Sequence, residues 1–255
     1  MTFARYKKPP FWEPDPRLKG VYNRNARNFN WRNLLFWKRE AWKDVKSFLE
    51  ERHKLGYTIF PSTNYEMIFR SLLVTSFLRT KIVIIGQDPY YVKGVADGLA
   101  FSCRPTTKPI PRSLQAIFLE YRQDLGFKYP INGSLLPWAN RGILLLNTYL
   151  TVEEGKPKSH RGTKYRTLWV PLVQEIIQQL SQRKDKLVFI LWGSVAQEHR
   201  YLIDENKHLV LVGAHPSPRN QTWTGGLGRK KFPGGRYFSK ACEYLSEPHS
   251  IWRLP

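Results

Sequence analysis

The chain has 255 residues, enough for one large domain or two small ones, and its 42% hydrophobic content can close a sizeable core. The 41 Lys and Arg residues outnumber the 20 Asp and Glu residues and give a net charge of +21. This charge predicts a polyanionic partner, either a phosphate polymer or an anionic membrane, and does not specify a fold. Nine Trp, 13 Tyr and 14 Phe exclude plain disorder, because so many rings must be packed away from water.

The two cysteines, Cys103 and Cys242, lie far apart in the chain and exclude both a disulfide framework and a cysteine-rich zinc site. They favour a reducing compartment. No run of about 18 apolar residues occurs, and the first ten residues lack the apolar region of a secretory signal. We therefore expect an intracellular, cytoplasmic protein, with the nucleus as the alternative if the source is a eukaryote or its virus.

The first elements of the chain are an arm and two helices. Residues 1–38 combine several prolines with scattered basic and aromatic residues and show no clear periodicity, which predicts an irregular basic arm. From residue 40 to 53 the apolar positions recur at helical spacing. Thr63 and Glu66 then have the pattern of a capping box, which predicts a second helix from Tyr65 to Leu73.

The rest of the chain alternates strand and helix patterns. Helical patterns occupy Ser113 to Tyr121, with Ser113 as the expected N-cap, and Leu168 to Leu180. Short apolar runs that are typical of fully buried strands occur at residues 81–86, 142–147, 186–193 and 208–213. Strands separated by helices predict an α/β fold: residues 39–255 should form a single domain with a central four-stranded parallel sheet flanked by helices.

Polar residues follow all four predicted strands. Ligands bind beyond the carboxyl ends of the strands in an open parallel sheet, because the loops there converge. The four runs lead to Asp88, Asn147, Ser194 and His215, that is, to an acid, an amide, a hydroxyl and an imidazole. Each residue alone has an ordinary explanation as a turn or cap residue. Together, on loops of which two are stiffened by proline, they predict a rigid functional site.

Five motifs in register give the chain a family resemblance. Over residues 40–255 the sequence resembles the family 1 uracil-DNA glycosylases. The resemblance implies a small parallel sheet flanked by helices, and hydrolysis of the bond between uracil and deoxyribose in DNA without a metal or an organic cofactor. The motifs that carry it are GQDPYY at 86–91, DGLAFS at 97–102, LLLN at 144–147, LWGS at 191–194 and HPSP at 215–218.

The resemblance implies that Asp88 and His215 are the catalytic residues, and their chemistry fits. Cleavage leaves positive charge on the sugar and negative charge on the departing base. An ionised Asp88 can stabilise an oxocarbenium-like sugar and orient or deprotonate the attacking water. His215 can donate a hydrogen bond to uracil O2, where negative charge gathers. By the same resemblance the backbone N–H groups of Gln87 and Asp88 face O2 as well.

The expected uracil-binding residues are Gln87, Tyr90, Phe101 and Asn147. The Asn147 carboxamide can give its NH₂ to O4 and accept N3–H, whereas cytosine would place a donor against a donor. Thymine has the same polar edge as uracil and must be excluded by shape, a task that the resemblance assigns to Tyr90, pressed against C5. Phe101 would stack on the base, although composition alone favours a core aromatic at this position.

Rotating a base out of a duplex costs stacking and pairing energy, which phosphate contacts must offset. Ser113, Ser194 and Ser217 lie in loops that can offer N–H and hydroxyl groups to phosphates, or that are ordinary tight turns.

Two positions depart from the family pattern. Tyr91 replaces a usual His and is a much poorer base near neutral pH. Arg219 replaces a usual Leu wedge, and we predict that it fills the gap in the base stack with a stronger salt dependence.

The remaining expectations concern partners and alternatives. The segment 220–231 is more basic than the family pattern leads one to expect, with Trp223 as a base or backbone contact or a buried anchor. The resemblance implies uracil-containing DNA as substrate and susceptibility to acidic proteins that mimic DNA, and we expect a monomer. The first alternative is a DNA-binding accessory subunit, against which the catalytic set argues. The second is a sister glycosylase that acts on mismatched thymine or another lesion, and Tyr90 argues against thymine.

Overall fold

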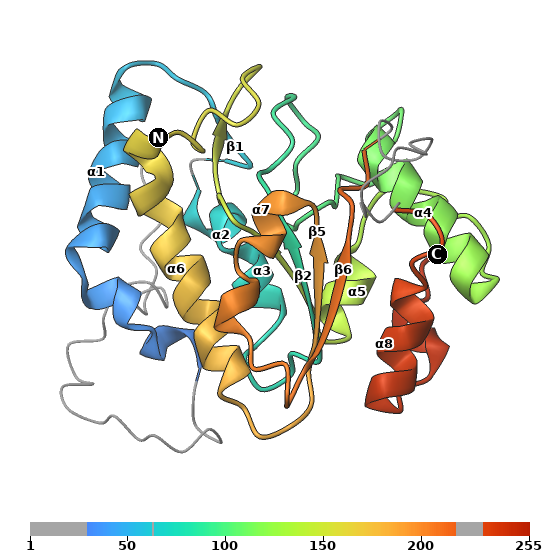
Figure 1. Ribbon diagram of the computed structural model, residues 1–255. Coiled ribbons are helices and arrows are strands. Elements are labelled where there is room, and N and C mark those ends of the chain that lie inside the picture. Colours follow the sequence, from blue (N-terminus) through green and yellow to red (C-terminus); the bar gives the residue numbers. More distant parts are fainter. Residues whose placement is uncertain (1–29, 63, 218–231) are drawn as a thin grey trace, which may run out of the picture.

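A computed structural model describes residues 30–62, 64–217 and 232–255 of the chain. At its centre is a four-stranded parallel sheet with the strand order β3-β2-β5-β6 (Figure 1). Its strands are β2 (Ile82–Gly86), β3 (Ile143–Asn147), β5 (Val188–Trp192) and β6 (Leu209–Gly213). The predicted α/β fold with a parallel sheet flanked by helices is confirmed.

Helices cover both faces of this sheet (Figure 1). One layer contains α1 (Glu40–Lys54), α3 (Arg70–Val74) and α6 (Thr163–Ser181), and the other contains α4 (Arg112–Leu125), α5 (Leu136–Asn140) and α8 (Tyr237–Leu245). The short helices α2 (Tyr65–Ile68) and α7 (Ser194–Gln197) and four 3-10 turns complete the described helical elements. A small antiparallel pair, β1 (Ile59–Phe60) with β4 (Val152–Glu153), leads into the loop before α6.

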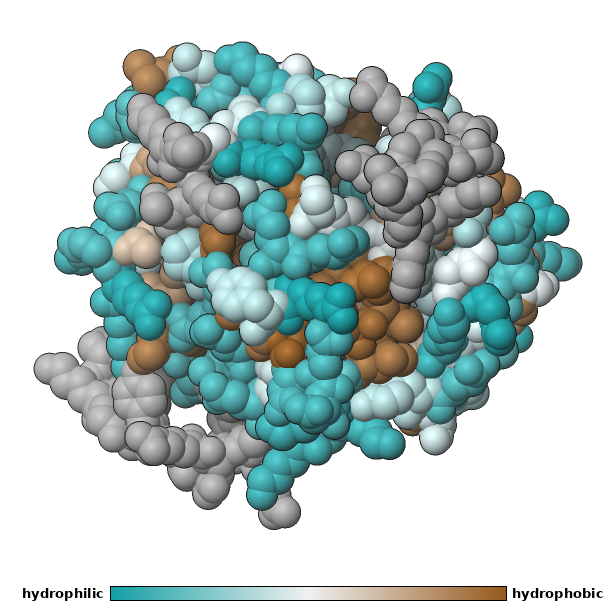
Figure 2. Space-filling view, in the orientation of Figure 1, coloured by the Kyte–Doolittle hydropathy of each residue, from teal (hydrophilic) through white to brown (hydrophobic). Residues whose placement is uncertain are grey.

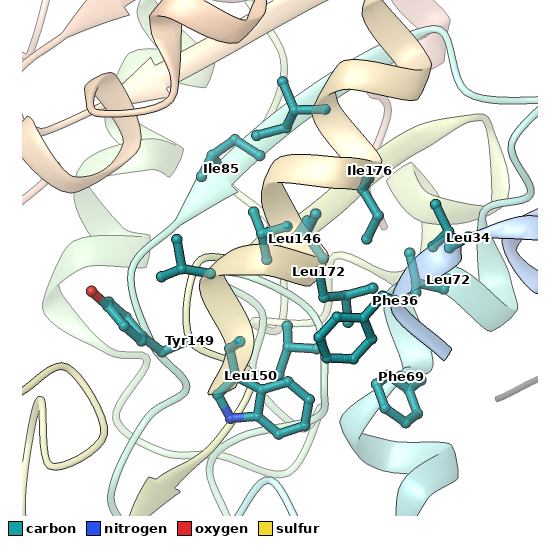
Figure 3. Close-up of a cluster of buried hydrophobic side chains, with 14 of the residues drawn as sticks. Leu34, Phe36, Phe69, Leu72, Ile85, Leu146, Tyr149, Leu150, Leu172 and Ile176 are labelled. Atoms are coloured by element: carbon teal, nitrogen blue, oxygen red, sulfur yellow. The ribbon is translucent and has the colours of Figure 1, made fainter. Parts of the chain in front are cut away.

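The alternation of side chains along each strand divides the core in two. Val83 and Ile85 point into the cluster under α1 and α6, whereas Ile82 and Ile84 point into the cluster under α4 and α8, and all four are fully buried. Figure 3 shows the first cluster, in which side chains of β2 and β3 pack against α6 and against residues 34 and 36. Strands β2, β3 and β5 are therefore fully buried between the two helical layers.

The edge strand β6 is less covered than its neighbours. Residues 209–212 are half-buried, and Figure 2 shows an apolar patch over this strand in the middle of the viewed face. Within the described ranges, none of the helices combines the length and the apolar character needed to cross a bilayer.

Part of the predicted arm belongs to the core, so the boundary at residue 38 is wrong for residues 30–38. Trp31, Phe36 and Trp37 are buried there in two 3-10 turns, Trp31–Asn33 and Leu35–Lys38. The Glu175 carboxylate of α6 accepts the backbone N–H groups of Leu35 and Phe36 at 2.5 and 2.8 Å. Short 3-10 turns have no helical periodicity, which is why the pattern did not reveal them. Residues 1–29 lie outside the described residues.

Three helix boundaries also differ from the expectation. The predicted helix from Tyr65 to Leu73 divides at Phe69 into α2 and α3. Its N-cap is Asn64, whose side chain accepts the N–H of Glu66 at 2.8 Å, and Thr63 lies outside the described residues.

The helix α4 starts at Arg112 with Pro111 as its N-cap, so Ser113 lies in the first turn and is not the cap. Helix α6 starts at Thr163, five residues earlier than the predicted start at Leu168.

Candidate active site

The site is built where β2 and β3 end side by side. Gly86, the last residue of β2, pairs with Asn147, the last residue of β3. Asn147 is buried, and a Cβ atom added to Gly86 would lie 2.2 Å from its Oδ1 atom. The carboxamide therefore occupies the space that only a glycine leaves free at this position. This places the amide at the carboxyl end of β2, directly before the loop that carries Asp88.

The Asp88 carboxylate is held by two donors from different parts of the chain. The Gln87 side chain donates from Nε2 to Oδ1 at 2.7 Å, and the backbone N–H of Lys158 donates to Oδ2 at 2.9 Å. Burial raises the pKa of Asp88 above the usual aspartate value, and these two hydrogen bonds and the charges of Lys158 and Arg161 oppose that rise. Both carboxylate oxygens thus have fixed orientations.

Tyr90 and Phe101 form one side of the site and are joined to each other by a hydrogen bond. The Tyr90 hydroxyl donates to the Phe101 carbonyl at 2.9 Å, and the Tyr90 ring packs against Phe60, Ala96 and Val152. Phe101 has a φ of 63°, a left-handed conformation that is uncommon for an aromatic residue. The hydrogen bond and the packing hold both rings in place at the strand ends.

Asp97 supports the segment that carries Phe101, and the sequence analysis assigned it no role. Asp97 is buried and accepts hydrogen bonds from the Ser102 hydroxyl at 2.7 Å and from the Leu99 N–H at 3.2 Å. The Arg70 guanidinium lies 3.5 Å from its carboxylate. The motif DGLAFS therefore includes its own internal support.

His215 follows β6 and packs closely on the end of β5. Gly193, with a φ of +90°, lies so near that a Cβ atom added to it would be 2.9 Å from the His215 Cβ atom. Burial, together with the nearby charge of Lys158, lowers the pKa of His215 below the usual histidine value. The imidazole is therefore neutral near pH 7 and has one N–H to donate.

Further contacts connect these segments. The centroids of the Phe101 and His215 rings are 5.9 Å apart. Ala100, next to Phe101, donates its N–H to the carbonyl of Leu145 in β3 and lies against Gly86. Hydrogen bonds thus join Gln87 to Asp88 and Tyr90 to Phe101, and a ring contact joins Phe101 to His215, while Asn147 packs against Gly86 directly before the Gln87–Asp88 loop.

Two of the expected phosphate-binding residues, Ser194 and Ser217, follow β5 and β6 at the same end of the sheet. Ser194 is exposed at the first position of α7, and Ser217 is half-buried and donates its N–H to the His215 carbonyl at 2.7 Å. Ser113 is half-buried in the first turn of α4. Arg219, Trp223 and the whole segment 220–231 lie outside the described residues.

The structure also places two residues that the motif pattern did not explain. The exposed fraction of Tyr91 is 39%, and its carbonyl accepts the N–H of Gly155 at 2.9 Å. Lys158, in the same loop as Gly155, reaches Asp88 through its backbone. The basic composition of residues 156–161 was the only sequence signal for this loop. In the described part of the chain, no group of three or more His, Cys, Asp and Glu side chains has the arrangement of a metal site.

Comparison with known proteins agrees with this geometry. The model of the uracil DNA glycosylase superfamily matches residues 74–246. A protein of Xylella fastidiosa strain M12 called uracil-DNA glycosylase is 42% identical over 221 residues, which cover 85% of this chain and 81% of that protein. The chain therefore belongs to the uracil-DNA glycosylase superfamily.

Solved structures have the same fold. The crystal structure of mimivirus uracil-DNA glycosylase superposes with a TM-score of 0.75 at 24% identity, covering 85% of this chain and 83% of that one. A variant of mimivirus UNG in complex with UGI gives a TM-score of 0.75 at 25% identity, with 86% and 85% of the two chains covered.

Proposed function

We propose that this protein removes uracil from DNA by hydrolysing the bond between the base and its deoxyribose, after the nucleotide has been rotated out of the helix. The observation that carries the proposal is the fixed Asp88 carboxylate, which lies at the same sheet edge as the Asn147 carboxamide and the His215 imidazole. The family membership and the net charge of +21 support it.

Asn147 reads the polar edge of the base. Its NH₂ group donates to O4 and its oxygen accepts N3–H, and the match is worth roughly 1 to 3 kcal/mol of discrimination against cytosine. Because Asn147 is buried against Gly86, the carboxamide does not need to be ordered when the base arrives. Tyr90 excludes the C5 methyl group of thymine by contact, and Phe101 stacks on the ring.

Asp88 and His215 act on the two ends of the breaking bond. The Asp88 carboxylate stabilises the positive charge that develops on the sugar and orients the water that attacks C1′. A neutral His215 donates its N–H to O2 and stabilises the negative charge on the departing uracil, together with the backbone N–H groups of Gln87 and Asp88. One such preorganised donor is typically worth about 2.7 to 4 kcal/mol. These residues supply the chemistry without a metal or an organic cofactor.

The flanking phosphates bind at the rim of the site. Ser113, Ser194 and Ser217 offer hydroxyl and backbone N–H groups to them, and Arg219 fills the space that the everted nucleotide leaves in the stack. An acidic protein that mimics the phosphate pattern of DNA would bind the same surface; a mimivirus relative is known in complex with the protein UGI. We propose that the protein acts as a monomer in the cytoplasm.

The decisive experiment is an excision assay in the presence of a chelator. We expect free uracil to be released from uracil-containing DNA, and release to fall about a hundred- to ten-thousandfold in Asp88→Asn, which keeps the shape of the side chain but not its charge. Equal release by the two proteins would contradict the role of Asp88. No release by the wild-type chain would contradict the proposed function.

A further inference from the structure

The loop of residues 154–162, between β4 and α6, is fixed near its start and at its centre. The N–H of Gly155 donates to the Tyr91 carbonyl at 2.9 Å, and the N–H of Glu153 donates to the Ser159 hydroxyl at 2.8 Å. At the centre the N–H of Lys158 donates to Asp88 at 2.9 Å. The loop is thus a wall of the site.

Lys158 occupies a special position in this wall. Its φ of 65° is left-handed, which turns its N–H toward the Asp88 carboxylate while its side chain stays exposed. The N–H of Arg161 donates back to the Lys158 carbonyl at 3.0 Å and fixes the turn. The ammonium group is therefore attached at a constrained point on the rim of the site, and its charge acts on both Asp88 and His215.

The expected binding partner of the Lys158 ammonium group in the substrate complex is a DNA phosphate. Asp88 faces the sugar of the everted nucleotide under the proposed function, and the phosphates are bonded to the oxygens of that same sugar. The backbone of Lys158 is hydrogen-bonded to the Asp88 carboxylate, and its side chain is exposed to solvent next to it. Its ammonium group is therefore close to the expected position of those phosphates. Lysine binds phosphate as a compact point charge.

We infer that Lys158 is a further substrate-binding residue: its backbone N–H orients the Asp88 carboxylate, and its ammonium group binds a DNA phosphate next to the everted deoxyuridine. The inference rests on the proposed function. It gives the 154–162 loop a role in substrate binding that none of the sequence motifs in the chain had indicated.

The test uses variants that keep the backbone and change the charge. Asn tolerates the left-handed conformation, so Lys158→Asn removes the ammonium group without disturbing the turn, and Lys158→Arg keeps the charge. The matched control is Lys184→Asn, because Lys184 is exposed in the turn before β5, at the opposite end of the sheet. All variants have the full chain and are compared by kcat/KM on duplex DNA that contains uracil.

We expect Lys158→Asn to lower kcat/KM roughly fivefold near 0.15 M salt, mainly through KM, and to reduce the slope of log(kcat/KM) against log[salt] by about 0.9. Lys158→Arg should restore both quantities. The acid limb of the pH profile should move to higher pH in Lys158→Asn, because the variant keeps the backbone N–H of residue 158, the Gln87 amide and Arg161 but loses the Lys158 charge, which favours ionised Asp88.

A substrate series identifies the phosphate. Replacing single phosphates around the uracil by neutral methylphosphonates should slow the wild-type protein at one position where it does not slow Lys158→Asn further. Additive losses at every position, or a salt slope in Lys158→Asn equal to that in Lys184→Asn, would overturn the inference while wild-type excision still supports the proposed function. Absence of excision by the wild-type chain would overturn both.

Discussion

At the scale of single residues, the site depends on close approaches that leave no room for one more carbon atom. The approach of Asn147 to Gly86 is the tightest of these in the base-reading part of the site. The Asn147 carboxamide is positioned by close packing against the backbone at Gly86 and not by a long side-chain network. Adding a single methyl group there should therefore have a large effect on recognition of the base.

We predict that Gly86→Ala displaces the Asn147 carboxamide, because the new Cβ atom would lie 2.2 Å from Oδ1. The loss of a bidentate contact corresponds to roughly a ten- to hundredfold lower kcat/KM for uracil excision. Gly162→Ala is the control, since nothing lies within 4 Å of its Cβ position. Steady-state kinetics of the two variants measure the difference; similar values would show that Asn147 does not read the base from this position.

The exclusion of thymine by the Tyr90 ring gives a second prediction at this scale. Tyr90→Phe removes only the hydroxyl that donates to the Phe101 carbonyl and keeps the ring, so we expect it to go on rejecting thymine. Tyr90→Ala removes the ring and should release thymine from ordinary DNA, because the C5 methyl group then meets open space. Thymine release is measured by chromatography. If Tyr90→Ala releases none, the ring is not the barrier.

At the scale of elements, the 154–162 loop is held to β4 by a buried polar network. His160 is fully buried, its Nδ1 lies 2.9 Å from the Thr151 hydroxyl, and its ring packs on Phe48. Burial lowers the pKa of His160 to about 4, and the nearby Glu153 carboxylate only partly opposes this. His160 is thus neutral in the folded protein over most of the acid range.

This lowered pKa predicts a pH-dependent stability of the fold. The unfolded chain binds a proton on His160 below about pH 6.5, and the folded chain binds it only near pH 4. Stability is therefore full above the unfolded value and is lost as pH falls toward 4, by about 2 kcal/mol between pH 6.5 and 5. Urea unfolding should show this loss in wild type and in the exposed control His249→Gln, and a smaller loss in His160→Gln. Parallel curves would refute it.

At the scale of the whole molecule, much of the fold and site could be predicted from the sequence. The strands are continuous apolar runs because β2, β3 and β5 are buried on both faces; Asn147 ends β3, and Asp88 and His215 come within two residues of the ends of β2 and β6. Residues 30–38 escaped prediction because their 3-10 turns have no period. The contact of Lys158 with Asp88 escaped it because it joins residues 70 positions apart through a left-handed backbone, which no local pattern encodes.

The attachment of residues 30–38 to α6 limits how the protein can be shortened. A version that starts at Glu40 would lack Trp31, Leu34 and Phe36, and would leave the Glu175 carboxylate buried without its two N–H donors. Such a deletion would impair folding, and the resulting loss of activity could be mistaken for the loss of DNA contacts made by the N-terminal residues. Experiments on the basic N-terminus therefore need to cut before Asn30, so that a change in catalysis reports on the charge of the removed residues.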